Sequence, residues 1–493
     1  MGNSVFSEST AQFIRQYLGE ESYESLLAES NGALMAASPD FAKYSCEYLL
    51  ADIMARPGLP IRERSMIIIS VMIANRYESV SNSHMRWALN VGITQEEVLE
   101  IVIQASALGN WPRGGELLDL FERAYPGYLK TVKENPFCKA ISQTGLTVRE
   151  KSLITMGALI ARRFGERLQE HMRYALSIGI TQNEILETIM QVTPFVGWPS
   201  GVDALSTAKE IFGPLTKINV QNGLVTKTQQ TGRHIIRQLS GGEENDELFT
   251  LIGDVFPDFM NVVTEGHLFG KIWSRPLLSL RDRSILTIAI LIAGPTAPYI
   301  HLPQCSALKS HMRYAVNAGL TIEEILEVIL QSGNYTCWGS GVQATRAAGL
   351  IFESEQKEKS PKYSSRELQK KGKHIIEKLH GGEAKDEFYR RIEEVCPDFM
   401  KVITEQHLFG EVWSRPGLEL RDRCLVALAI FIAGRFGVEL KAHIGYALNI
   451  GLSREEILEI ILHTANYTCW DAGGDAIRAS IEIFEAGSSC QYP

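Results

Sequence analysis

Apolar residues recur at helical spacing along the whole chain, and they predict an all-helical protein. The stretch Cys424–Ala433 is apolar throughout and long enough for a buried helix. Further on, Ile457, Ile460 and Ile461 are spaced three and four apart, which places them on one side of a helix. We find no convincing alternation of apolar and polar residues that would indicate a strand or a hairpin. The expected fold class is therefore all-α.

Four histidines carry the same neighbours, which shows that one helical unit occurs four times. Each histidine is followed by a glycine and then by a tryptophan, always at the same two spacings, and the four are His84, His171, His311 and His443. A fixed pattern of this kind indicates tandem structural units, here called repeats 1 to 4. The glycine suits the left-handed position that ends a helix. A capping box then opens the next helix in each repeat, at Thr94/Glu97, Thr181/Glu184, Thr321/Glu324 and Ser453/Glu456.

The repeats also predict where domains begin and end. Repeat 1 covers residues 1–126, repeat 2 covers 127–212 with a shortened front half, repeat 3 covers 232–352, and repeat 4 covers 366–493. Repeats 3 and 4 align without gaps over their front halves, and repeat 3 then carries an inserted loop at 295–309. The polar segments 213–231 and 353–365 are predicted to be linkers.

Composition narrows the classes of partner and compartment. The chain of 493 residues is 45% hydrophobic and 22% charged, as expected of a globular protein, and its net charge of −9 argues against nucleic acid or an anionic membrane as the partner. Eight scattered cysteines form no Cys-x-x-Cys pair, so we expect neither a disulfide framework nor a zinc site. With no secretory signal and no apolar run long enough to span a bilayer, a cytoplasmic location is expected.

His443 is the strongest candidate for chemistry. Glu439 lies one helical turn before it, on the same face of the predicted helix. A carboxylate there can fix the tautomer of the imidazole and raise its basicity. The other repeats have Val80, Arg167 and Ala307 at that place. The alternative is a core histidine beside a solvated glutamate, and both interpretations stay open.

Several arginines have two interpretations. Arg421 opens the first apolar helix and has a counterpart in every repeat, whereas Arg415 follows Trp413 and is matched in repeat 3 by Arg275 after Trp273. A guanidinium fork suits a substrate carboxylate, but it equally suits an ion pair with a neighbouring repeat. One glutamate follows each histidine at a constant spacing and is expected to make structural polar contacts; the four are Glu100, Glu187, Glu327 and Glu459.

The segment from Phe409 to Ile457 resembles the carboxymuconolactone decarboxylase family. The resemblance rests on Trp413-Ser-Arg-Pro-Gly, Arg421-Asp-Arg, Glu439-x-x-x-His443 and Ala447-Leu-Asn-x-Gly451. It implies an all-helical oligomer that works without metal or organic cofactor and removes carbon dioxide from a carboxylated unsaturated lactone. The peroxidase branch of the family has a Cys-x-x-Cys ahead of the histidine, which this chain lacks at His84 and His443. Near Trp470 the chain has Cys-Trp-Asp-Ala in place of the small segment typical of the decarboxylases, which leaves the substrate open.

The resulting hypothesis is a cofactor-free lyase acting on a small carboxylated lactone or polyketide-like compound, in a biosynthetic or catabolic pathway. The expected catalytic residues are His443 and Glu439, and the expected substrate-binding residues are Arg415, Trp413, Arg421, Asn449 and Tyr467. A second site in repeat 3 would consist of His311, Arg275, Trp273 and Tyr335. The alternatives are an isomerase, cyclase or dehydratase using the same acid–base pair, or a non-catalytic helical scaffold. A small-molecule substrate and a homo-oligomer are the expected partners.

Overall fold

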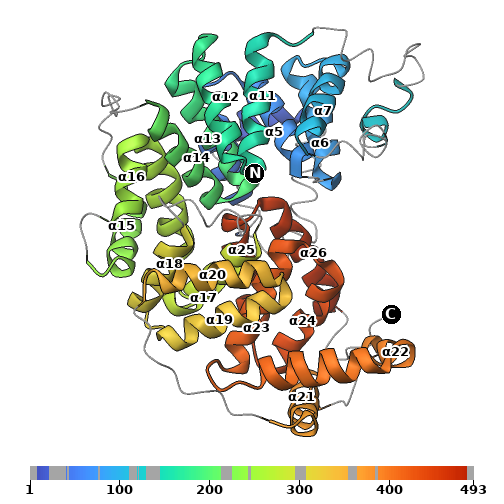
Figure 1. Ribbon diagram of the computed structural model, residues 1–493. Coiled ribbons are helices and arrows are strands. Elements are labelled where there is room, and N and C mark those ends of the chain that lie inside the picture. The colour runs from blue at the N-terminus through green and yellow to red at the C-terminus, as the bar shows by residue number, and fades with distance from the viewer. Residues whose placement is uncertain are drawn as a thin grey trace. The chain divides into compact units, whose positions relative to one another are not determined.

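The regular structure is helical, as the spacing of apolar residues predicts. The computed structural model describes residues 8–20, 40, 44–75, 78–109, 119, 121–128, 145–212, 225–242, 246–294, 307–352, 363–382 and 387–485. Within these residues every regular element is a helix (Figure 1). None of the helices described there combines the length and apolarity needed to cross a membrane. Residues 295–306 of the predicted inserted loop at 295–309, and most of the two predicted linkers, lie outside the described residues.

Each repeat contributes a consecutive set of helices. Repeat 1 contains α1 (Glu8–Leu18), the π-helix η1 (Ser45–Met54), α5 (Ile61–Asn75), α6 (Glu78–Ala88), the short 3₁₀ helix η2 (Leu89–Val91) and α7 (Gln95–Gly109). Repeat 2 contains α11 (Val148–Ala161), α12 (Gly165–Ser177), α13 (Gln182–Val196) and α14 (Trp198–Phe212).

The later repeats are longer at the front. Repeat 3 contains α15 (Lys227–Leu239), α16 (Glu247–Val255), the π-helix η4 (Phe259–Trp273), α17 (Leu280–Ala293), α18 (Ala307–Asn317), α19 (Ile322–Tyr335) and α20 (Trp338–Gly349). The first turn of α15 lies in the segment 213–231 that was expected to be a linker, so the helix begins earlier than expected. Repeat 4 contains α21 (Ser365–Leu379), α22 (Glu387–Val395), the π-helix η6 (Phe399–Trp413), α23 (Leu420–Gly434), α24 (Gly437–Asn449), α25 (Arg454–Tyr467) and α26 (Trp470–Glu485).

The chain folds into two compact units whose limits differ from those of the repeats. Compact unit 1 contains Met1–Gln229, Glu247–Leu268 and Thr468–Asp471, and compact unit 2 contains Gln230–Asp246, Phe269–Tyr467 and Ala472–Pro493. The front of repeat 3, from α16 through most of η4, thus packs with repeats 1 and 2 rather than with the rest of its own repeat. Compact unit 2 is built mainly from repeats 3 and 4.

The helix ends confirm the sequence signals. Gly92, Gly179, Gly319 and Gly451 all have positive φ, between 81° and 101°, which a residue with a side chain rarely adopts. All four predicted capping boxes are formed, with the hydroxyl accepting from the backbone N–H three residues on and the glutamate accepting in return. These signals fix the start of the third helix in every repeat.

One apolar helix lies at the centre of each repeat. In α23 the residues from Asp422 to Ile432 are all buried, including most of the predicted apolar stretch. A helix buried on every side must be covered by several neighbours. Accordingly, α5 packs against α11 in compact unit 1, and α17 packs against α23 in compact unit 2 (Figure 1). Repeats 1 and 2 therefore form one pair, and repeats 3 and 4 form another.

A close crossing positions the end of η6. This π-helix packs along α21, and a Cβ atom on Gly372 would overlap the carbonyl oxygen of Glu405. On the other side of the crossing, a Cβ atom added to Gly410 would lie 2.3 Å from the carbonyl oxygen of Leu368, which is also an overlap. Because only glycine allows two backbones to approach so closely, these two positions set the depth of η6. They thereby place Trp413, its last residue, inside the repeat.

Candidate active site

Arginines and glutamates of paired repeats hold each other reciprocally. In compact unit 2, Glu327 of repeat 3 accepts from Arg415 at 2.7 Å and from the fully buried Arg423 at 3.0 Å, both of repeat 4. In the opposite direction, Glu459 of repeat 4 accepts from Arg275 and Arg283 of repeat 3, at 2.7 Å each. For Arg275 and Arg415 the structure thus shows the ion pair rather than a free substrate clamp.

The recurrent arginine at the start of the first apolar helix is also paired. Arg421 contacts Asp282 at 2.7 Å and Glu456 at 3.0 Å, and Arg281 contacts Asp422 at 2.7 Å. The contacts with Asp282 and Asp422 join α17 to α23, so Arg421 also ties repeats 3 and 4 together.

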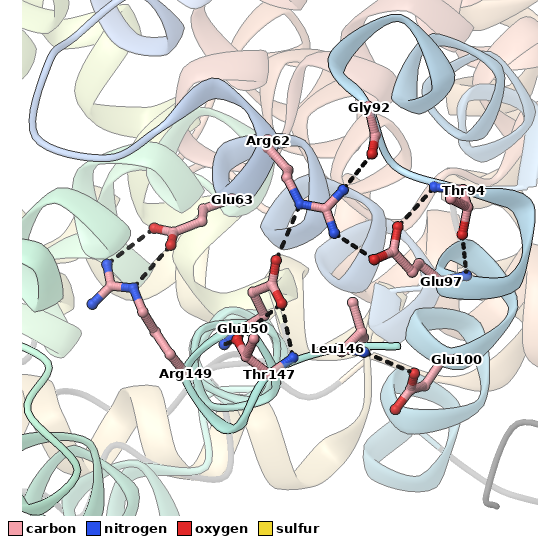
Figure 2. Close-up of polar contacts among 10 residues, drawn as sticks. All are labelled: Arg62, Glu63, Gly92, Thr94, Glu97, Glu100, Leu146, Thr147, Arg149 and Glu150. Carbon is pink, nitrogen blue, oxygen red and sulfur yellow. Dashed lines mark hydrogen bonds and ion pairs between the residues drawn. The ribbon is translucent and has the colours of Figure 1, made fainter. Parts of the chain in front are cut away.

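Repeats 1 and 2 have the same arrangement. Figure 2 shows Arg62 between Glu97 (2.6 Å) and Glu150 (3.1 Å), with Arg149 donating to Glu63 (2.9 Å). Here α5 and α11 take the places that α17 and α23 have in the other pair.

Two of the buried carboxylates, Glu327 and Glu187, remain charged because they are paired. Burial by itself would raise the pKa of Glu327, but hydrogen bonds from Arg415 and Arg423 outweigh it and the pKa is lowered. The same balance lowers the pKa of Glu187, which is held by Arg56 and Arg64. An arginine whose positive charge is already neutralised by such a carboxylate is poorly placed to bind an anionic substrate as well.

A chain of hydrogen bonds runs through the buried side chains around His443. The indole Nε1 of Trp413 donates to the hydroxyl of Tyr335 at 2.9 Å, and that hydroxyl lies 3.4 Å from Nε2 of His443. Nδ1 of His443 donates to the main-chain carbonyl of Glu439 at 2.8 Å. Phe431 covers the imidazole, with ring centroids 4.5 Å apart. We call Trp413, Tyr335, His443 and Phe431 the His443 cluster.

The His443 cluster is uncharged and has a defined proton arrangement. A carbonyl oxygen can only accept, so Nδ1 carries the hydrogen and Nε2 presents its lone pair. Burial lowers the pKa of His443 to about 4, and burial raises the pKa of Tyr335 well above its usual value. Tyr335 is therefore the donor and the neutral imidazole is the acceptor at neutral pH.

Two residues predicted for this site lie elsewhere. The side chain of Glu439 is exposed, and it is the main-chain carbonyl of this residue that contacts the imidazole. Asn449 donates to the carbonyl of Leu379 at 2.8 Å, which joins the end of α24 to the end of α21. Asn449 thus has a structural partner.

A second cluster surrounds His311, and it contains Tyr467 rather than the expected Tyr335. Trp273 donates to the hydroxyl of Tyr467 at 3.0 Å, and the ring of Tyr467 lies 5.5 Å from that of His311. Nε2 of His463 lies 2.9 Å from the hydroxyl of Thr287 in the same cluster. The expected grouping of Tyr467 with His443, and of Tyr335 with His311, is wrong: each tyrosine serves the histidine of the paired repeat.

Family comparison accounts for the repeated architecture. A model described as the carboxymuconolactone decarboxylase family matches residues 39–122, 135–210, 257–349 and 397–485, which together make up more than half of the chain. The chain belongs to this family. One match falls within each of the four repeats, and the matches confirm the family resemblance drawn from repeat 4.

Individual proteins match over shorter stretches of this chain. A 4-carboxymuconolactone decarboxylase from Acinetobacter baylyi is 36% identical over 88 residues, which cover 18% of this chain and 65% of that protein. A nitrosuccinic acid decarboxylase from Metarhizium robertsii is 40% identical over 67 residues, 14% of this chain and 46% of that protein. An uncharacterized 15.0 kDa protein from Paracoccus denitrificans is 32% identical over 93 residues, 18% of this chain and 69% of that protein.

Repeats 1 and 2 keep the family scaffold but not the same cluster. Met54 precedes Arg56 as Trp273 precedes Arg275 and as Trp413 precedes Arg415. Phe195 follows the histidine of its repeat at the spacing of the two tyrosines, so it replaces the tyrosine, and its ring lies 6.1 Å from that of His84. His84 instead contacts the hydroxyl of Tyr17, at 3.0 Å from Nδ1. The phenylalanine offers no hydroxyl donor at this position.

Several residues of these clusters were not predicted from the sequence. His463 does differ from the other repeats in the sequence, because glutamine stands at its position there, as Gln104, Gln191 and Gln331. Phe431 carries no such signal, because it is one apolar residue within an apolar helix. In the described part of the chain, no group of three or more His, Cys, Asp or Glu side chains could hold a metal ion.

Proposed function

We propose that this chain is a decarboxylase that acts on a small carboxylated substrate at the His443 cluster. The observation that supports the proposal most is the hydrogen-bonded series Trp413, Tyr335 and His443, which is uncharged and surrounded by aromatic rings. Two proteins that are similar to short stretches of this chain are named as decarboxylases, of 4-carboxymuconolactone and of nitrosuccinic acid. Both names describe small carboxylated molecules.

An uncharged aromatic site favours loss of carbon dioxide. A carboxylate loses part of its hydration on entering such a site, whereas the transition state spreads the charge over a larger system. The carbon–carbon bond breaks, carbon dioxide leaves, and the electron pair stays on the substrate carbon, delocalised onto a conjugated oxygen. The hydroxyl of Tyr335 and the indole N–H of Trp413 are donors suited to stabilise that oxygen.

His443 would supply the proton that replaces carbon dioxide. An anionic substrate beside Nε2 raises the pKa of the imidazole, so substrate binding is coupled to the uptake of one proton from water. Nε2 then transfers this proton to the carbanion, and the imidazole returns to its neutral form. The bond from Nδ1 to the carbonyl of Glu439 keeps the ring oriented throughout.

The test is release of carbon dioxide from 4-carboxymuconolactone and from nitrosuccinate by the full chain. Replacing His443 with Ala should lower the rate about 10²–10⁴-fold, which is the usual contribution of a positioned acid or base. The matched control is His84→Ala, which removes a buried histidine from a repeat that lacks the Trp–Tyr pair, and should retain the rate.

Three outcomes would contradict the proposal. One is an unchanged rate in the His443→Ala variant, and another is an equal loss in the His84→Ala variant. The third is conversion of a carboxylated lactone without release of carbon dioxide, which would favour an isomerase, cyclase or dehydratase instead.

A further inference from the structure

The turn between α23 and α24 is held in a strained conformation. Arg435 has a φ of 57°, in the left-handed region that a residue with a side chain rarely adopts. Its guanidinium forms an ion pair with Asp475 in α26. The counterpart in repeat 2, Arg163, has a φ of 53° and pairs with Asp203 in the same way. Strain of this kind persists only where the surrounding structure holds it, so the main chain of both turns is fixed.

Three aromatic rings lead from this turn to the candidate active site. The ring of Phe436, which follows Arg435, folds back over the end of α23, where a Cβ atom on Gly434 would overlap it. The ring centroid of Phe436 lies 6.2 Å from that of Phe431, and the ring centroid of Phe431 lies 4.5 Å from that of His443. The turn is thus connected to the imidazole through two successive ring contacts.

Exposure falls steeply along this series of rings. Phe436 is 47% exposed, whereas Phe431 is 5% and His443 is 7% exposed. Val438, two residues after Phe436, is 66% exposed. The next residue, Glu439, accepts from Nδ1 of His443 through its main-chain carbonyl. The turn therefore presents two large apolar side chains to water at the place where the chain also contacts the imidazole.

The equivalent ring in repeat 2, that of Phe164, is held by two cations. The guanidinium carbons of Arg162 and Arg167 lie 5.9 Å and 5.2 Å from its centroid. An arginine over the face of an aromatic ring attracts that ring. In repeat 4 these two positions are occupied by Gly434 and Glu439, so neither arginine is present there. The main chain of the two turns is therefore alike, whereas the hold on the ring differs.

We propose that Phe436 is the gate of the His443 cluster, and that its ring limits the size of the substrate that reaches the imidazole. The inference rests on the proposed function, because it takes the His443 cluster as the site of the reaction. The turn is fixed at Arg435, so opening consists of a rotation of the Phe436 side chain rather than a movement of the main chain. Rotation of the ring away from Gly434 uncovers Phe431, whose ring a planar unsaturated substrate contacts beside His443.

The first test measures access to His443 without relying on turnover. Diethyl pyrocarbonate modifies neutral imidazole groups, and peptide mass spectrometry gives the rate of modification at each histidine. At neutral pH His443 is uncharged, because burial lowers its pKa to about 4. The Phe436→Ala variant should raise the modification rate at His443 severalfold. The rate at His311, which is 0% exposed, should stay low and serves as the reference for intact folding.

The equivalent ring in repeat 2 provides the matched control. Phe164→Ala removes that ring and should leave the modification rate at His443 unchanged. A second variant, Gly434→Ala, should raise this rate as well, because the added methyl group pushes the ring of Phe436 outwards. An unchanged rate in the Phe436→Ala variant would overturn the proposal, as would a rise of the same size in Phe164→Ala or at His311.

The second test measures selection by size. Since 4-carboxymuconolactone is larger than nitrosuccinate, Phe436→Ala should raise kcat/KM for the lactone relative to nitrosuccinate by about tenfold, as a changed fit in an apolar pocket does. Phe436→Trp should shift the ratio in the opposite direction, and an unchanged ratio in both variants would remove Phe436 from substrate selection. If the wild type releases carbon dioxide from neither compound, the proposed function fails, whereas the modification rate at His443 still decides whether Phe436 controls access.

Discussion

The two repeat pairs share one scaffold but differ in the side chains around their histidines. Repeats 3 and 4 hold the Trp–Tyr–His arrangement twice, around His443 and around His311. Repeats 1 and 2 retain a buried His84, but Met54 and Phe195 replace the tryptophan and the tyrosine. The hydroxyl and indole donors are thus absent from these positions in one pair and present in the other.

The buried ion pairs, by contrast, recur in both pairs of repeats. Arg64 with Glu187 in the first pair matches Arg423 with Glu327 in the second, and both arginines are fully buried. These ion pairs are also present in repeats 1 and 2, where the indole and hydroxyl donors are replaced. Their role is therefore to hold the paired repeats together, and it does not depend on the proposed decarboxylation. The ion pairs common to both pairs are therefore structural, whereas the hydroxyl and indole donors beside the histidine, which differ between the pairs, point to function.

The largest effect is expected from breaking a buried ion pair. Replacing Glu327 with Ala leaves the guanidinium of Arg423 buried without its carboxylate, and should lower the free energy of unfolding by about 3–5 kcal/mol. Equilibrium urea unfolding followed by circular dichroism measures this value. The equivalent Glu187→Ala in the first pair should cost a similar amount, because Arg64 is equally buried.

The matched control uses the one repeat in which the buried arginine is replaced by lysine. Glu100 pairs with Lys151 at 2.7 Å, and the Lys151 side chain is 34% exposed. Water can solvate this ammonium group, so Glu100→Ala should cost only about 1 kcal/mol. Equal losses for Glu100→Ala and Glu327→Ala would mean that burial of the cation does not set the cost.

Much of the fold was predictable from the sequence, for an identifiable reason. Capping boxes, helix-ending glycines and apolar spacing are local signals, so the helix that begins after Ser453 could be placed without a structure. The pairing of repeats is not local. No spacing within the chain states that Tyr335 crosses to His443, because that contact joins residues 108 positions apart through two packed helices.

The candidate site was predictable only in part for a similar reason. The sequence indicates that Glu439 and His443 are one turn apart on one helix, and they are. It cannot show whether the carboxylate or the main-chain carbonyl meets the imidazole, because this depends on which group water solvates better. Nor does it show that Arg415 is already held by a glutamate of the other repeat.

The next largest effect should come from removing the hydroxyl that distinguishes the two pairs. Tyr335→Phe keeps the ring beside Phe431 but removes the hydroxyl that joins Trp413 to His443, so kcat should fall about 10²-fold. Steady-state release of carbon dioxide measures it. The control is Phe195→Tyr in the first pair, which should leave the rate unchanged; a Tyr335→Phe variant with full activity would remove the hydroxyl from the mechanism.

A smaller effect is expected from pH. Burial lowers the pKa of His443 to about 4, below the value of about 6.5 for an exposed imidazole. The unfolded chain then binds more protons between these values, so the stabilisation is complete above about pH 6.5 and is lost as the pH falls towards 4. The slope is about 1.4 kcal/mol per pH unit for each such imidazole. Urea unfolding at pH 7.5, 6 and 5 should show it, and His443→Asn should reduce the slope; an unaltered slope would contradict the prediction.

The smallest effect is expected at Glu439, where the carboxylate and the carbonyl of one residue make competing predictions. If the carboxylate oriented His443, Glu439→Gln would weaken the base and lower kcat. In the structure that side chain is exposed and the carbonyl accepts from Nδ1, a contact that Gln preserves. Glu439→Gln should therefore change the free energy of unfolding by less than about 0.5 kcal/mol, as surface substitutions do. It should also leave the pH profile of kcat in place, because the main chain, which no substitution of the side chain removes, holds the imidazole. A displaced pH profile in this variant would return the carboxylate to the mechanism, and this carboxylate would then distinguish repeat 4 from the other three repeats, which have Val80, Arg167 and Ala307 at its position.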